Sequence, residues 1–131
     1  MCLSSADHHS SLPEKRSTIH QPYSRAVVSG GHVFCSGTLG IDPATGKAPE
    51  SAPDQAEQAL VNLAGILSES GSSMRQLVKT TIYYVGTQDF AAINEAYARH
   101  MPDPPPARSA VPCSALPDGL LFCIDAIAAL G

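Results

Sequence analysis

The stretch that decides the fold is QLVKTTIYYVGTQDFAAINEAYARH, residues 76–100. Residues 76–85 are rich in β-branched and aromatic side chains, a composition typical of a strand. Over residues 89–100, apolar side chains recur at three- and four-residue steps, which predicts a helix with one apolar face. A strand followed directly by an amphipathic helix predicts a sheet with that helix packed against it.

A second helix is predicted upstream, over residues 53–70. Pro53 and Asp54 suit a first helical turn, because proline needs no donor there and a carboxylate complements the positive helix N-terminus. Apolar residues then recur on one face, and Gly71 supplies the C-terminal stop. The apolar face consists of Ala56, Ala59, Leu60, Leu63, Ile66 and Leu67.

Turn signals divide the remaining chain into short strands. Gly30 and Gly31 predict a hairpin, and we expect Gly37 to end its second strand. Pro and Gly predict turns at residues 42–46 and 117–119, and four prolines predict an extended loop at 101–106. The predicted strands are residues 26–29, 32–36, 76–85, 107–114 and 120–129, with room for one more before the first helix.

This order predicts an α+β fold in which two helices cover one face of a mixed β-sheet. The opposite sheet face also needs cover, and we expect an oligomer to supply it. Residues 1–18 are rich in Ser, His and charge without any period, so we expect a flexible N-terminal arm. Residues 19–131 then form a single domain.

Composition excludes several classes of function. The net charge is −4, and no basic cluster could neutralise a row of phosphates, so we expect no nucleic-acid partner. No apolar run reaches about 18 residues, which predicts no membrane span, and the first residues lack the order of a signal peptide. The four cysteines form no CxxC pair, which indicates reduced thiols in a cytoplasmic protein rather than a metal site.

Four stretches, in this order, resemble the RidA/YjgF family, which is also labelled endoribonuclease L-PSP. They are CSGTLGIDPATG at 35–46, LVKTTIY at 77–83, DFAAINEAY at 89–97 and PARS at 106–109. The tail IDAIA at 124–128 also resembles the family's ending, and the resemblance covers about residues 21–130. It implies a chorismate-mutase-like homotrimer with three pockets between subunits. It also implies hydrolysis of 2-aminoacrylate and related enamines or imines to 2-keto acids and ammonia, without a cofactor.

Arg108 is the strongest candidate site residue. A guanidinium presents a fork that binds a carboxylate through two parallel hydrogen bonds. A lone arginine more often makes a surface salt bridge, but the Pro-Ala-Arg-Ser context of Arg108 resembles the family's substrate-carboxylate arginine. The family usually has Cys where this chain has Ala110, and the resemblance implies that the backbone of this residue meets the substrate.

Four further residues are expected to bind substrate. Tyr23 lies in Gln-Pro-Tyr-Ser, similar to the family's Gly-Pro-Tyr-Ser, although it could equally anchor the arm to the sheet. Ser36 and Gly37 end a predicted strand, where a hydroxyl and open backbone could face a ligand, or where a plain turn serine could lie. Asn94 is unfavourable within a helix by propensity, so it either hydrogen-bonds in the pocket or supports a neighbouring loop.

Cys123 marks a departure from the family. The resemblance places it where family members usually have a Glu that positions the attacking water. A thiol has a pKa of about 8.5 and is a poor acceptor at neutral pH. Asp125 points to the same strand face and could replace the carboxylate, although it is displaced by roughly 6.6 Å. Alternatively, Arg108 could lower the thiol pKa, or Cys123 could merely fill space in a pocket with different chemistry.

The leading functional interpretation is hydrolytic deamination of a small enamine or imine that carries a carboxylate. Arg108 would bind the carboxylate, and Cys123 or Asp125 would position the attacking water. One alternative is a RidA-like enzyme of a specialised pathway that catalyses condensation, cyclisation or tautomerisation of an imine-like intermediate. Another is a non-enzymatic carboxylate-binding trimer. The acidic balance argues against the ribonuclease label.

Overall fold

The structure is a computed structural model that describes residues 10–11 and 21–131 of the chain. One mixed sheet has the strand order β1-β2-β3-β6-β4-β5. Its strands are β1 (Ser10–Ser11), β2 (Ala26–Ser29), β3 (His32–Leu39), β4 (Leu77–Val85), β5 (Ala107–Cys113) and β6 (Phe122–Ala129). All neighbouring strands are antiparallel except β4 and β5, which run parallel.

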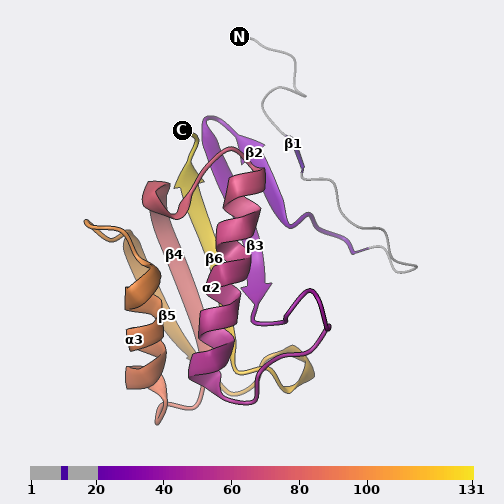
Figure 1. Cartoon of the computed structure of the whole chain (residues 1–131), viewed down its shortest axis with the longest axis vertical. Helices are drawn as coiled ribbons and strands as arrows, with labels where there is room; N and C mark the ends of the chain where they lie inside the picture. The colour runs from indigo at the N-terminus through magenta and orange to yellow at the C-terminus, as the bar shows by residue number, and fades with distance from the viewer. Residues whose placement is uncertain (1–9, 12–20) are drawn as a thin grey trace.

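Two helices, α2 (Ala52–Glu69) and α3 (Phe90–His100), cover the same face of the sheet (Figure 1). Leu60, Leu63 and Leu67 of α2 are fully buried in one core cluster with Phe122 and Ile124 of β6. Burial of such large side chains stabilises the fold by about 1.5–3 kcal/mol each. The expected α+β architecture, with both helices on one face of a mixed sheet, is confirmed.

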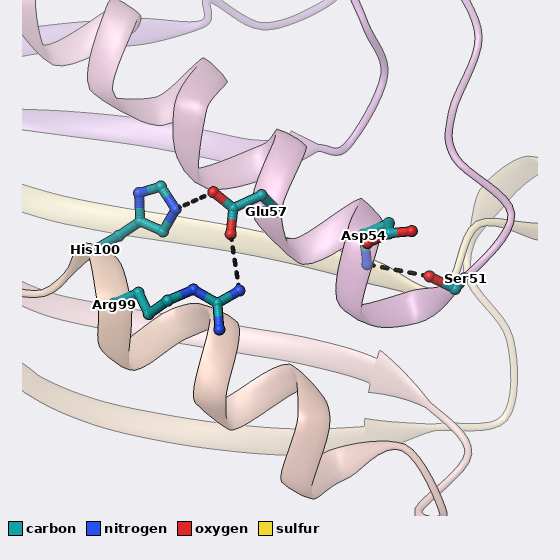
Figure 2. Close-up of polar contacts among 5 residues, drawn as sticks. All are labelled: Ser51, Asp54, Glu57, Arg99 and His100. Carbon is teal, nitrogen blue, oxygen red and sulfur yellow. Dashed lines mark hydrogen bonds and ion pairs between the residues drawn. The ribbon is translucent and has the colours of Figure 1, made fainter.

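The ends of α2 follow from its sequence. The Ser51 hydroxyl accepts a hydrogen bond from the backbone N–H of Asp54 at 3.2 Å, which satisfies one of the unpaired donors of the first turn (Figure 2). After the helix, Gly71 adopts a φ of +86°, a conformation that glycine tolerates and that most residues avoid. The predicted bounds of both helices are correct to within one residue.

A surface carboxylate joins the two helices. Glu57 of α2 accepts a hydrogen bond from Arg99 Nη2 at 3.2 Å and is hydrogen-bonded to His100 Nε2 at 2.5 Å (Figure 2). The hydrogen bond with His100, followed by the one from Arg99, lowers the pKa of Glu57. Because His100 is the last residue of α3, the pair fixes the helix just before the loop that leads to β5.

Strand β3 corrects one prediction, because it continues past Gly37 to Leu39. Cys35 pairs with Ala126 and Thr38 with Ile124, so three steps along β3 match two along β6. This extra residue makes a bulge, which accommodates Gly37 without ending the strand. The additional strand expected before α2 is reduced to a single bridge between Asp42 and Lys47.

The arm expected at residues 1–18 lies outside the described residues, apart from Ser10–Ser11, which pairs with β2. The turn predicted at 117–119 is a short 3₁₀ helix, and another, Met74–Gln76, precedes β4. In the described part of the chain, no helix is long and apolar enough to cross a membrane.

The sheet face opposite the helices is open in a single chain. Side chains of β6 alternate between fully buried, such as Phe122 and Ile124, and half-buried, such as Cys123 and Asp125. Phe34, which lies on β3 next to the bulge, is 45% exposed. A single chain therefore presents Phe34 and the half-buried side chains of β6 on this face.

Candidate functional site

Arg108 lies at the start of β5, opposite Thr80 of β4, and its side chain extends over α3. Its Nη1 donates a hydrogen bond to Asn94 Oδ1 at 2.7 Å. Its guanidinium carbon lies 4.8 Å from the centroid of the Tyr97 ring and 6.0 Å from that of Phe90. Stacking on an aromatic face and a short hydrogen bond together fix the orientation of the fork.

The ring beneath the guanidinium is itself held in place. Tyr97 is buried, and its hydroxyl is hydrogen-bonded to Thr80 Oγ1 at 2.6 Å. A guanidinium has five N–H donors, so the bond to Asn94 leaves donors for a ligand. The structure therefore holds the guanidinium in one orientation, and it brings together Arg108 and Asn94, two of the candidate site residues.

A hollow of about 370 Å³ opens beside Arg108. Its polar groups come from Asn94 and Arg108, and the rest of its wall is largely apolar. The apolar residues include Tyr97, Ala98, Met101, Pro102, Pro105 and Pro106. Arg108 itself is exposed in a single chain, so its charge faces solvent at the edge of this apolar wall.

Tyr23, Ser36 and Gly37 line a different hollow, of about 860 Å³, between the chain before β2 and helix α2. The Ser36 hydroxyl donates to the backbone oxygen of Ser24 at 2.6 Å, and the Ser36 backbone N–H donates to that of Arg25 at 3.0 Å. Within one chain, Ser36 therefore holds the segment that carries Tyr23. The structure groups these three predicted residues together and separates them from Arg108.

Cys123 and Asp125 form a third group, on the open sheet face. Tyr83 of β4 pairs with Cys123 across the strands, and its hydroxyl donates to Asp125 Oδ2 at 3.0 Å. A methyl group added at Gly37 would lie 2.9 Å from Cys123 Sγ, so the thiol packs directly against the bulge of β3. Gly37 thus connects the second group with the third.

The electrostatics of this face oppose a thiolate. Burial, followed by the nearby charge of Asp125 and by Cys113, raises the pKa of Cys123 to about 11. The hydrogen bond to Asp125 raises the pKa of Tyr83 as well. Within one chain, Arg108 lies on the other side of the sheet from Cys123, so this Arg108 does not lower the pKa of the thiol.

Ala110 is half-buried, pairs with Ile82 of β4 and packs against the core. Its side chain therefore offers nothing to a ligand. The contacts of Tyr83 and Tyr97 were not predicted, because in sequence both look like ordinary residues of a strand and of a helix. Among the described residues, no three His, Cys, Asp or Glu side chains are grouped to hold a metal ion.

The family model described as Endoribonuclease L-PSP matches residues 14–130, nearly the whole chain. The chain belongs to the RidA/YjgF family. Its relatives include the Reactive Intermediate Deaminase A, chloroplastic, of Arabidopsis thaliana, 44% identical over 118 residues that span 89% of this chain and 63% of that protein. The 2-iminobutanoate/2-iminopropanoate deaminase of Capra hircus is 39% identical over 84% of this chain and 81% of that protein.

Solved structures show the same RidA fold. The crystal structure of RidA from an Antarctic Psychrobacter species superposes with a TM-score of 0.80 at 36% identity, covering 88% of this chain and all of that one. The family relationship therefore extends from the sequence motifs to the arrangement of sheet and helices. It also identifies this RidA-family chain as a relative of proteins named imine deaminases.

Proposed function

We propose that this chain hydrolyses a small 2-imino acid, or its enamine tautomer, to the 2-keto acid and ammonia. The observation that carries the proposal is the oriented fork of Arg108, which is held by Asn94 and Tyr97 at the mouth of an apolar hollow. Such a fork binds a carboxylate in a fixed orientation. The relatives named deaminases act on substrates whose names describe imino acids, that is, carboxylates next to a C=N bond.

The chemistry needs little beyond orientation and a proton acceptor. A protonated imine carbon is already electrophilic, so holding it beside a water supplies much of the rate enhancement. The water oxygen bonds to the imine carbon, and the C=N electron pair moves to nitrogen. Breaking the C–N bond then gives the ketone and ammonia. No redox change occurs, so the reaction requires no cofactor.

The proposed site is shared between copies of the chain. Arg108 lies on the helix side of the sheet, whereas Cys123 and Asp125 lie on the open side. In a single chain, the group that would bind the carboxylate, Arg108, and the candidate proton acceptors, Cys123 and Asp125, therefore lie on opposite faces of the sheet. We propose a homotrimer that buries the open faces and places Arg108 of one subunit near the third group of the next.

Sedimentation equilibrium at micromolar concentration is expected to give the mass of three 13.7 kDa chains. Replacing the exposed Phe34 by Asp should shift the mass towards the monomer, because a charge buried at an interface without a partner is costly. Replacement of Ser68 by Asp is the control, because Ser68 is exposed on α2 and lines neither hollow, and it should leave the mass unchanged. A wild-type chain that sediments as a monomer would contradict the shared site.

The activity itself is expected in a coupled assay. A pyridoxal-phosphate enzyme generates 2-aminoacrylate in place, and the release of pyruvate is timed with and without this protein. We expect faster release with the protein, since an oriented imine reacts with water more readily than a free one. Release at the uncatalysed rate would contradict the proposal and favour a binding protein without enzyme activity.

Cys123 supports a second candidate function. Within one chain, burial and the charge of Asp125 raise the pKa of its thiol to about 11, so the thiol stays protonated at neutral pH there and is a poor base. A specialised reaction of an imine-like intermediate, such as condensation, cyclisation or tautomerisation, would tolerate the replacement of the family's Glu by Cys123.

We place the protein in the cytoplasm, where the free thiols of Cys35, Cys113 and Cys123 stay reduced.

A further inference from the structure

We infer that Tyr83 and Asp125 form the proton-handling pair of this protein, with Asp125 as the base for the attacking water and Tyr83 as the residue that positions it. This inference rests on the proposed deamination and identifies the groups that perform its proton transfers. Neither the family motifs nor the names of the relatives assign a role to Tyr83.

The geometry of the open sheet face carries the inference. Tyr83 donates to Asp125 Oδ2 at 3.0 Å, across two paired strands whose backbones are fixed by the sheet. Both side chains are half-buried. The bond uses one oxygen of the carboxylate, and the other, Oδ1, remains to accept a hydrogen bond from water. Asp125 is thus held in one rotamer instead of sampling several.

Tyr83 and Asp125 lie beside Cys123, the residue at the position of the family's Glu. Cys123 is the direct strand partner of Tyr83 and is two residues from Asp125 on the same strand face. Cys123 Sγ packs against the β3 bulge at Gly37, which leads on to the hollow lined by Ser36 and Tyr23. The carboxylate of Asp125 therefore belongs to the same face as the residue that stands in the position of the family's Glu.

A tyrosine suits the second role in this pair. The bond to Asp125 and partial burial raise the pKa of Tyr83, so the phenol stays protonated and remains a donor at neutral pH. A donor that never loses its proton keeps the carboxylate fixed while the carboxylate gains and loses its own. Positioning within about half an ångström is what separates an efficient base from a slow one.

Asp125 accepts one proton and returns it in each turnover. Asp125 removes a proton from water as the water oxygen bonds to the protonated imine carbon, giving a carbinolamine and a neutral Asp125. Asp125 then returns this proton to the amino group. The C–N bond breaks, the hydroxyl oxygen forms the ketone, and the hydroxyl proton leaves with ammonia as ammonium. Asp125 ends as a carboxylate, ready for the next substrate.

The test is a double-mutant cycle measured as kcat and KM in the 2-aminoacrylate assay. Asp125→Asn, which keeps the shape of the side chain, should lower kcat by about 10²- to 10⁴-fold. Tyr83→Phe, which removes only the hydroxyl, should lower kcat by about 10- to 100-fold with KM unchanged. Because Tyr83 acts through Asp125, Tyr83→Phe should have no further effect on kcat in the Asp125→Asn background.

Tyr84→Phe is the matched control. Tyr84 follows Tyr83 in sequence but lies on the buried side of the sheet, where its ring centroid is 4.9 Å from that of Phe90. The kcat of Tyr84→Phe should stay within about twofold of the wild-type value. A normal kcat for Tyr83→Phe or for Asp125→Asn overturns the inference alone, provided that the wild type is active. An equal loss from Tyr83→Phe in both backgrounds also overturns it. A wild-type chain without activity overturns the proposed function and this inference together.

Discussion

Arg108→Ala is expected to lower kcat/KM for 2-aminoacrylate by about 10²- to 10⁴-fold. Arg108 is exposed in a single chain, but the proposed trimer covers it, and losing one partner of a covered charge pair is costly. The physical reason is the pre-oriented fork. Asn94 at 2.7 Å and the Tyr97 ring at 4.8 Å already hold the guanidinium, so the substrate carboxylate binds without ordering a flexible side chain. Alanine removes both the charge and the orientation.

Arg108→Lys should restore little of this activity. A lysine ammonium is a point charge that cannot present two parallel donors, and it stacks less well on an aromatic ring. The exposed Arg75, which lies in the 3₁₀ helix before β4, provides the matched control, and Arg75→Ala should leave kcat/KM unchanged. Equilibrium binding of pyruvate by calorimetry gives a second measurement. Normal turnover by Arg108→Ala would show that the assigned hollow is not the active site.

Cys123→Glu is expected to have its largest effect in a chain that lacks the Asp125 carboxylate. In the Asp125→Asn background, we expect Cys123→Glu to raise kcat by about 10²- to 10⁴-fold, since it restores a general base to the same strand face. In the wild-type background the gain should be much smaller, because two adjacent carboxylates raise each other's pKa and one of them stays protonated.

Space determines whether this rescue succeeds. Cys123 Sγ already touches the bulge at Gly37, so the longer Glu side chain must extend towards the open face. Cys123→Asp, which is shorter, separates crowding from chemistry, and Cys123→Ser is the control that supplies a polar group without a base. If kcat of the Asp125→Asn chain stays unchanged with both acidic replacements, a carboxylate at position 123 cannot act as the base, and the family's Glu position takes no part in catalysis in this chain.

Local sequence rules predicted most of the fold. The apolar face of α2 and the Gly30-Gly31 hairpin are local patterns, and both elements appear where those patterns placed them. The bulge in β3 was missed because it depends on pairing with β6, a strand about 90 residues further along the chain. Gly37 looked like a strand terminator, since local rules do not show which partner strand a glycine will face.

The site was predictable only in part, for the same reason. Arg108 and Asn94 were found from motifs, and they meet because β5 runs beside α3. The stacking of Arg108 on Tyr97 and the bond from Tyr83 to Asp125 join residues that are 11 and 42 positions apart, and they follow from tertiary packing alone. Alternation along β6 did place Cys123 and Asp125 on one face, as the pleat of any strand requires.

The edge strand β5 affects how readily this protein aggregates. Among the described strands, β5 is paired on one side only, with β4, so its other side resembles an open template for a further strand. Pro112 interrupts that template, because proline has no backbone N–H to donate. Pro112 therefore disfavours fibril-like strand addition at this edge in a chain whose open sheet face is exposed before assembly.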